Sequence, residues 1–77
     1  MSDCGKRIYI IKWINKYSNE VGYVRYIKEE KRHFVNTYNK SEAEKYRTRE
    51  KAEMAIDVLN AIGEGKMNQF IIEHYLG

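Results

Sequence analysis

Few side chains in this 77-residue sequence could take part in catalysis. Cys4 is a potential nucleophile, and His33, His74 and Glu73 are potential proton-transfer groups. A nucleophile needs a base nearby and a third group that orients that base. Cys4 stands in a polar terminus where nothing holds it near a histidine, so we expect a free surface thiol. We expect both histidines to be ordinary strand residues, and we predict that the protein is not an enzyme.

Metal and cofactor sites are not indicated either. No spacing of cysteine, histidine, aspartate or glutamate matches a zinc, calcium or iron site. The sequence also lacks a glycine-rich loop that could cradle phosphate groups. We therefore expect neither a metal nor a cofactor.

The composition favours a small intracellular domain. The single cysteine excludes an internal disulfide, which suits a reducing compartment. The first residues, Met-Ser-Asp-Cys-Gly, lack the apolar core of a signal peptide, and no apolar run is long enough to span a membrane. We expect residues 1–77 to form one cytoplasmic domain with a thin core, because so short a chain buries only about 60–65% of its unfolded surface.

Residues 48–65 carry the clearest structural signal and predict one long helix. Apolar residues recur there with the i, i+3, i+4, i+7 spacing of a single helical face. These residues are Ala52, Ala55, Ile56, Leu59 and Ile62. The hydroxyl of Thr48 can accept a hydrogen bond from a free backbone N–H, so Thr48 is the predicted N-cap. Gly63 or Gly65 can adopt the left-handed conformation that ends a helix.

The rest of the chain is typical of strands that this helix covers. Alternating and β-branched residues predict a meander over residues 6–38, then a turn at 39–47 and a C-terminal strand at 67–76. The strands of the meander are residues 6–15, 21–28 and 33–38, and residues 1–5 are expected to be flexible. Gly22 indicates a twist, a bulge or a close backbone approach.

The predicted fold class is α+β. We expect an antiparallel three- to four-stranded sheet in the order β-β-β-α-β, with one long helix packed on one face. Within the turn, Ala43 and Tyr46 are expected to point inward together. The sequence leaves open where the last strand docks.

Alternation along the strands separates two faces of the sheet. The uncharged face, which we call the inner face, is expected to meet the helix and carries Tyr9, Ile11, Trp13, Val24, Tyr26, Phe34, Tyr38, Phe70 and Ile72. The opposite, outer face carries Ile8, Ile10, Lys12, Ile14, Tyr23, Arg25, Ile27, Val35, Ile71 and Tyr75. A solvated sheet face is normally polar, so an apolar outer face with dispersed cations predicts contact with another molecule. Because aromatic and arginine anchors dominate interface energies, the predicted partner-binding residues are Lys12, Tyr23, Arg25 and Ile27.

Charge is distributed unevenly and supports a second hypothesis. Residues 1–40 hold nine basic and four acidic side chains, whereas residues 41–77 hold five and seven. Basic residues interleaved with tyrosines can neutralise phosphates and stack on bases. The candidate nucleic-acid contacts are Arg7, Lys12, Arg25, Lys28 and Arg32.

Two stretches resemble nucleic-acid-binding domains. Residues 22–27 (Gly-Tyr-Val-Arg-Tyr-Ile) are similar to the glycine-aromatic strand of RNA-recognition modules. Residues 8–62, with a helix start at residues 46–55 (Tyr-Arg-Thr-Arg-Glu-Lys-Ala-Glu-Met-Ala), resemble the three-stranded sheet and helix of integrase arm-binding domains and plant ethylene-response factors. That resemblance implies a basic sheet that enters the DNA major groove. A fourth strand does not belong to this pattern.

Residues 42–52 (Glu-Ala-Glu-Lys-Tyr-Arg-Thr-Arg-Glu-Lys-Ala) resemble a motif of small orphan proteins of phages and prophages of Gram-positive bacteria. This resemblance implies a non-catalytic inhibitor of a bacterial defence complex, such as an anti-CRISPR protein that blocks a CRISPR-Cas effector sterically. Its partner would be a host protein or ribonucleoprotein complex in the bacterial cytoplasm. An acidic strip on the helix is a secondary candidate contact, formed by Glu50, Glu53, Asp57 and Glu64. A homodimer packed sheet to sheet is a further explanation of the apolar outer face.

Overall fold

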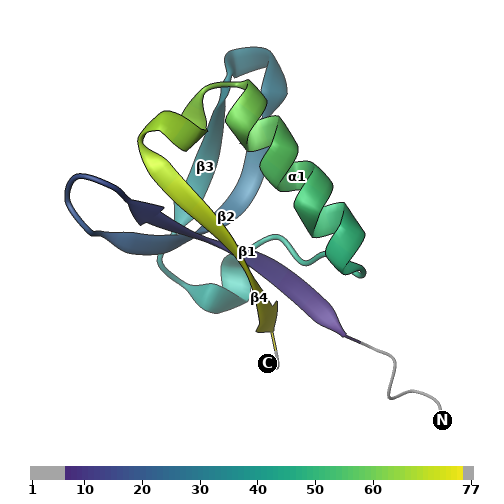
Figure 1. Ribbon diagram of the computed structural model, residues 1–77. Coiled ribbons are helices and arrows are strands. Elements are labelled where there is room, and N and C mark those ends of the chain that lie inside the picture. The colour runs from purple at the N-terminus through teal and green to yellow at the C-terminus, as the bar shows by residue number, and fades with distance from the viewer. Residues whose placement is uncertain (1–6, 76–77) are drawn as a thin grey trace, which may run out of the picture.

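The computed structural model describes residues 7–75 and shows, within them, one four-stranded antiparallel sheet and one α-helix packed against it (Figure 1). The strands are β1 (Ile8–Asn15), β2 (Val21–Lys28), β3 (His33–Thr37) and β4 (Asn68–Tyr75), and the helix is α1 (Arg49–Ala61). Short 3₁₀ turns follow at η2 (Glu29–Lys31), η3 (Lys40–Glu42) and η4 (Glu64–Lys66). The α+β prediction is confirmed. The expectation for residues 1–5 lies outside the described residues.

Helix α1 begins where the sequence predicted and ends earlier. The hydroxyl of Thr48 accepts a hydrogen bond from the backbone N–H of Lys51 at 3.1 Å, so Thr48 is the N-cap. The helix stops at Ala61 because Gly63 takes a left-handed φ of 98°. The predicted extension to residue 65 is therefore wrong, and those last residues form the separate turn η4.

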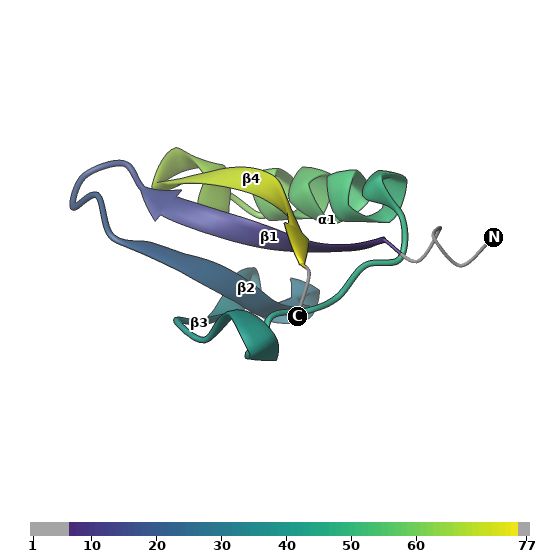
Figure 2. The same cartoon turned by 90° about the horizontal axis from the view of Figure 1, so that it is seen from below.

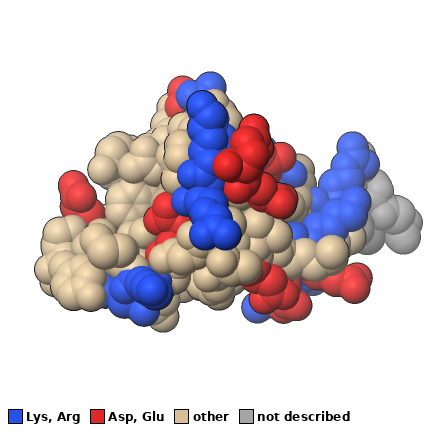
Figure 3. Space-filling view, turned by 90° about the horizontal axis from the view of Figure 1, so that it is seen from above, with Lys and Arg blue, Asp and Glu red and all other residues tan. Residues whose placement is uncertain are grey.

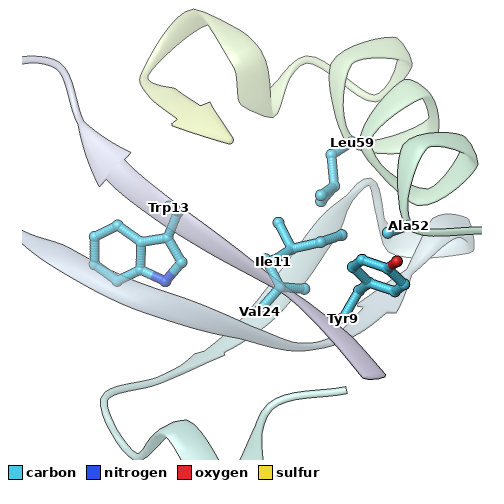
Figure 4. Close-up of a cluster of buried hydrophobic side chains, with 6 residues drawn as sticks. All are labelled: Tyr9, Ile11, Trp13, Val24, Ala52 and Leu59. Carbon is cyan, nitrogen blue, oxygen red and sulfur yellow. The ribbon is translucent and has the colours of Figure 1, made fainter. Parts of the chain in front are cut away.

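The inner face and the helix share the main core. Its buried members are Tyr9, Ile11, Trp13, Val24, Ala52 and Leu59. In Figure 4, Leu59 reaches toward Ile11 from the helix, Ala52 lies beside Tyr9, and Trp13 lies at the far end, beyond the helix. The apolar stripe of the helix thus covers one end of the sheet and leaves the other end to Trp13.

At Gly22 the backbone of β2 comes close to a side chain of β1, which is one of the three roles predicted for this glycine. A Cβ atom at Gly22 would lie 2.7 Å from Cε2 and 2.9 Å from Nε1 of Trp13. The indole therefore rests directly on the β2 backbone, where it is 4% exposed. Its Nε1–H donates to the carbonyl oxygen of Tyr23 at 3.1 Å, which satisfies the buried donor.

A β-bulge changes which residues of β2 face the helix. Val24 pairs with Asn36, but the next pair is Tyr26 with Val35, so Arg25 has no partner in β3. The extra residue reverses the alternation after it. Ile27 consequently packs against the inner core, and Tyr26 is 42% exposed. The predictions of Tyr26 as an inner residue and of Ile27 as an outer residue are both wrong.

Strand β4 docks beside β1, which the sequence left open. The sheet order is β3-β2-β1-β4, and the β1–β4 register runs from Ile8 opposite Tyr75 to Asn15 opposite Asn68. Although β3 and β4 are opposite edges, the ring centroids of Phe34 and Phe70 lie only 5.7 Å apart in an edge-to-face contact. The sheet is therefore strongly curled around its inner face.

Residues 39–46, which we call the wedge segment, separate β1 from β2. Pairing of these two strands extends only as far as Lys12 opposite Tyr23. Beyond that point Tyr9 exchanges two backbone hydrogen bonds with Tyr46, at 2.9 and 2.8 Å, and the N–H of Glu44 donates to the carbonyl of Val24 at 3.0 Å. Figure 2 shows β2 diverging from β1 and the chain passing between them toward α1. The backbone groups freed by this divergence thus find partners in the wedge segment.

The wedge segment also buries part of the outer face. Ile10 points away from the main core and is fully buried. Its cross-strand partner Glu73 lies 3.8 Å from the ammonium of Lys40, so the wedge segment passes over this part of the sheet. Ala43 is 3% exposed and lies outside the main core cluster, whereas Tyr46 packs against that cluster. The sequence predicted that Ala43 and Tyr46 point inward together, and this prediction is wrong.

Candidate functional site

The potential catalytic residues do not converge. His33 lies on β3 and its Nδ1 is 3.3 Å from the carbonyl oxygen of Phe34, while His74 lies on the opposite edge strand with its ring against Tyr9. Glu73 faces the outer side beside Lys40. Cys4 lies outside the described residues. Among residues 7–75, no three side chains of histidine, cysteine, aspartate or glutamate gather closely enough to hold a metal ion.

One tyrosine has a clearly perturbed ionisation. Burial raises the pKa of Tyr46 to about 12, and the nearby negative charge of Glu44 adds to the shift. Tyr46 is the residue of the wedge segment that bridges to β1, so this pKa reflects how tightly the wedge segment packs there. Within the described part of the chain, no helix has the length and apolar character needed to cross a membrane.

The candidate nucleic-acid residues are dispersed over the molecule. Arg25 lies 3.9 Å from Glu42, and the ammonium of Lys28 lies 5.8 Å from the ring centroid of Tyr26. Arg32 ends η2, beyond the acidic residues of that turn, and Lys12 is half-buried in the middle of β1. Arg7 is exposed before β1 begins. On the face shown in Figure 3, lysine and arginine side chains are interspersed with acidic ones, and no broad basic field forms there.

The four predicted partner-binding residues do not lie on one common surface. Lys12 and Tyr23 are direct cross-strand neighbours on the outer face. Arg25 occupies the bulge and pairs with Glu42, and Ile27 faces the core. The structure thus brings together only two of the four.

The wedge segment covers a second part of the outer face as well. The ammonium of Lys40 lies 5.9 Å from the ring centroid of Tyr23, and that of Lys45 lies 4.8 Å from the ring centroid of Tyr75. Thr37 donates from its hydroxyl to Glu42 at 3.1 Å. Part of the outer face that was predicted to contact another molecule is therefore covered by the chain itself.

An apolar patch remains open near the β1–β2 turn. We call it the hairpin-end patch and define it as Lys12, Ile14, Val21 and Ile71. Lys12 pairs with Ile71 on β4, and Ile14 pairs with Val21 on β2, so the four residues are contiguous on the outer face. Val21 is 43% and Ile71 38% exposed. None of the ion pairs found within residues 7–75 involves Lys12.

A hollow of about 330 Å³ opens on the inner face at the same end of the sheet. The curled sheet forms it beyond the helix, with Trp13 and Phe34 among its lining residues. The lining comprises Trp13, Asn15, Glu20, Phe34, Asn36, Tyr38, Glu64 and Asn68. Tyr38 was predicted to be core, but it is 64% exposed and sets its ring 5.9 Å from that of Trp13.

The sequence carries a signal for this hollow in its asparagines rather than in its ionisable residues. The inward-facing alternation of three strands reaches an asparagine at the same end of the sheet: Asn15 in β1, Asn36 in β3 and Asn68 in β4. Polar residues in core-facing positions indicate either a buried network or a wet hollow.

The acidic strip predicted on the helix is not a single surface. Glu53 pairs with Arg49 at 3.4 Å, as expected for an i, i+4 ion pair. Glu64 lies beyond the helix in η4, where it lines the hollow. The helix therefore presents a shorter acidic strip than predicted.

Comparison with known proteins adds no relatives. The chain matches no protein-family model, and neither a curated protein nor a solved structure matches it.

Proposed function

We propose that the chain is a non-catalytic protein-binding module that docks through the hairpin-end patch. The observation that supports it is the exposure of Val21 and Ile71 beside Lys12, on a sheet whose remaining outer surface is largely covered by the wedge segment. Clustered apolar side chains at the surface mark interaction sites. The ammonium of Lys12 has no carboxylate partner within residues 7–75, so the complementary surface is apolar with one acidic side chain opposite Lys12.

The biological role we propose is inhibition of a bacterial defence complex, such as a CRISPR-Cas effector, by steric blockade in the bacterial cytoplasm. This part of the proposal is supported by the resemblance of residues 42–52 to small phage and prophage proteins. In the structure those residues form the second part of the wedge segment and the start of the helix, and their backbone hydrogen bonds reach Tyr9 and Val24, away from the β1–β2 turn. We therefore assign the motif to the scaffold and the contact to the patch.

Binding to purified targets tests the proposal. The patch variant carries Val21→Glu and Ile71→Glu, which place charges on exposed apolar positions. Met54→Glu is the matched control, because Met54 is 60% exposed on the helix and lies outside the patch. Wild-type protein should bind and inhibit at least one complex in a panel of purified Cas effectors and other defence complexes. The patch variant should lose that binding and the control should keep it.

Three results would contradict the proposal. A panel with neither binding nor inhibition removes the defence role. Equal binding by the patch variant and by wild type removes the patch. Self-association in light scattering that disappears in the patch variant assigns the patch to a homodimer instead. A duplex-binding assay over a salt series runs beside these tests, since phosphate contacts predict affinity that falls steeply with salt.

A further inference from the structure

The inner-face hollow has the composition of a site for a cationic side chain. Two carboxylates, Glu20 and Glu64, line it together with the aromatic rings of Trp13, Phe34 and Tyr38. None of the ion pairs within residues 7–75 engages either carboxylate. Both charged residues of the lining are thus acidic, on a protein whose formal net charge is +3.

Hydrogen bonds already engage several polar groups around the hollow. The side-chain oxygen of Asn15 is already occupied, because it accepts from the N–H groups of Tyr17 and Ser18 at 2.9 Å each. The ammonium of Lys16 is directed to the carbonyl of Gly65 at 2.9 Å. The indole N–H of Trp13 is committed to Tyr23. The hollow therefore offers a ligand the carboxylates of Glu20 and Glu64, together with the amide of Asn36 and the hydroxyl of Tyr38, which can donate as well as accept.

Asn68 provides an independent indication that a polar group belongs in the hollow. Its side chain lines the hollow, and the residue is only 8% exposed. Its amide hydrogen bonds are long: it accepts from Asn15 at 3.4 Å and donates to the carbonyl of Glu64 at 3.5 Å. A buried amide is normally bonded at about 2.9–3.0 Å. The oxygen of Asn68 therefore has one long hydrogen bond and a second lone pair that a ligand donor can use.

We propose that this hollow receives an arginine side chain from the partner protein. A guanidinium has five N–H donors in a fixed plane, which suits two carboxylates and an amide oxygen, and its flat faces stack on aromatic rings. The exposed ring of Tyr38, held edge-on against Trp13, offers such a face. A lysine ammonium would be attracted by the carboxylates, but it has no planar group to stack on the aromatic rings.

This inference rests on the proposed function, because it specifies what the partner presents beside the hairpin-end patch. The patch and the hollow lie on opposite faces of the sheet at the end where β1 turns into β2. A partner that grips this end therefore contacts the patch with an apolar surface and enters the hollow with an arginine.

Peptide titration tests the hollow without the partner. The probe is acetyl-Gly-Arg-Gly-amide, and the comparison peptides replace arginine by lysine or by citrulline, its uncharged near-isostere. Trp13 is the only tryptophan, so its fluorescence and its indole N–H resonance report directly on the hollow. We expect weak binding of the arginine peptide, on the order of 1–10 mM, because one side chain makes few contacts.

Carboxylate variants identify the site. Glu20→Gln and Glu64→Gln should each weaken arginine binding by roughly threefold, the size expected for a charge pair open to solvent. Glu30→Gln, which removes a carboxylate in η2 away from the hollow, should leave it unchanged. Circular dichroism of each variant shows whether the fold is retained.

The outcomes separate the two proposals. Equal shifts with arginine and citrulline, equal affinity for arginine and lysine, or no shift of the Trp13 signals would each overturn the arginine site. Loss of partner binding in the Val21→Glu, Ile71→Glu variant with unchanged arginine-peptide binding supports both surfaces. Partner binding that survives Glu64→Gln and Glu20→Gln together retains the patch and overturns the hollow as a partner contact.

Discussion

Replacement of Gly22 by alanine tests the central packing feature of the sheet, the indole of Trp13 lying on the β2 backbone. The added methyl would lie 2.7 Å from Cε2 and 2.9 Å from Nε1 of the ring, well inside van der Waals contact. Trp13 is 4% exposed and lies between the β2 backbone and the hollow, so relief of the clash requires the indole to leave β2. Gly22 does not have a positive φ, so the effect is steric and involves no backbone strain.

The expected destabilisation can be assembled from its parts. Overpacking a core costs about 1–3 kcal/mol. If the indole moves away from β2, its hydrogen bond to Tyr23 is lost as well, at about 1 kcal/mol. Restricting the unfolded chain with alanine returns roughly 0.4–1 kcal/mol. The net loss is about 2 kcal/mol, which is large for a domain near the low end of the usual range of roughly 5–15 kcal/mol.

Urea unfolding measures this loss, followed by circular dichroism and by the fluorescence of the single tryptophan. The urea concentration at the midpoint should fall. In thermal unfolding, Tm should be lower by roughly 10 °C for a domain of this size. The emission of Trp13 in the folded variant should shift to longer wavelength. Gly65→Ala is the matched control. Its Cβ would clash with the side-chain oxygen of Asn60, but this oxygen is the free end of an exposed side chain that can rotate away. The backbone Cα of Asn60 lies 3.7 Å from that Cβ, which is an ordinary contact.

A double-mutant cycle with Trp13→Phe isolates the contact, because the smaller ring leaves room for the methyl group. The alanine at Gly22 should cost less than half as much in the phenylalanine background. An unchanged midpoint and emission spectrum in Gly22→Ala would falsify the close approach of the indole to β2.

Three further predictions concern the helix and the wedge segment. Leu59→Ala should destabilise the fold by about 2–5 kcal/mol in urea unfolding, because Leu59 is fully buried; a loss below 1 kcal/mol would contradict its place in the core. Thr48→Ala should cost about 1 kcal/mol through loss of the N-cap bond to Lys51, whereas Thr48→Ser should retain it; equal losses would mean that the hydroxyl is not the cap. The pKa of Tyr46, raised to about 12, lies above its unfolded value, so its contribution to stability is complete below about pH 10 and disappears as the pH rises to about 12. After allowance for partial exposure that contribution is about 1 kcal/mol, and Tyr46→Phe should flatten the decline of stability over this range; an unchanged decline would place the effect elsewhere.

Features set by local chemistry were predictable from the sequence. The N-cap at Thr48 follows from one hydroxyl and one N–H within a single turn, and the stripe that contains Ala52 and Leu59 follows from helical periodicity. The bounds of β2 were also correct, since Val21–Lys28 is a β-branched and aromatic run between polar turns. Each of these features depends on neighbours in the sequence.

Features set by distant backbone were not predictable. The bulge at Arg25 reverses the alternation of β2, and nothing in the side-chain pattern marks it. The choice of β1 as the neighbour of β4 leaves the same residues facing inward as docking against β3 would. In the sequence, the wedge segment has the pattern of a polar turn. Its backbone N–H and C=O groups find hydrogen-bond partners in the sheet only because β1 diverges from β2.

This same divergence explains why both candidate surfaces lie at one end of the molecule. At the end where β1 and β2 separate, the helix covers the inner face and the wedge segment covers the outer face. At the hairpin end the strands are paired, so no chain enters between them and both faces stay accessible. The exposed Val21 and Ile71 are on one side there, and the carboxylates of Glu20 and Glu64 are on the other. A partner that recognises this protein through its sheet therefore has to approach the β1–β2 turn, where a single binding surface can engage both.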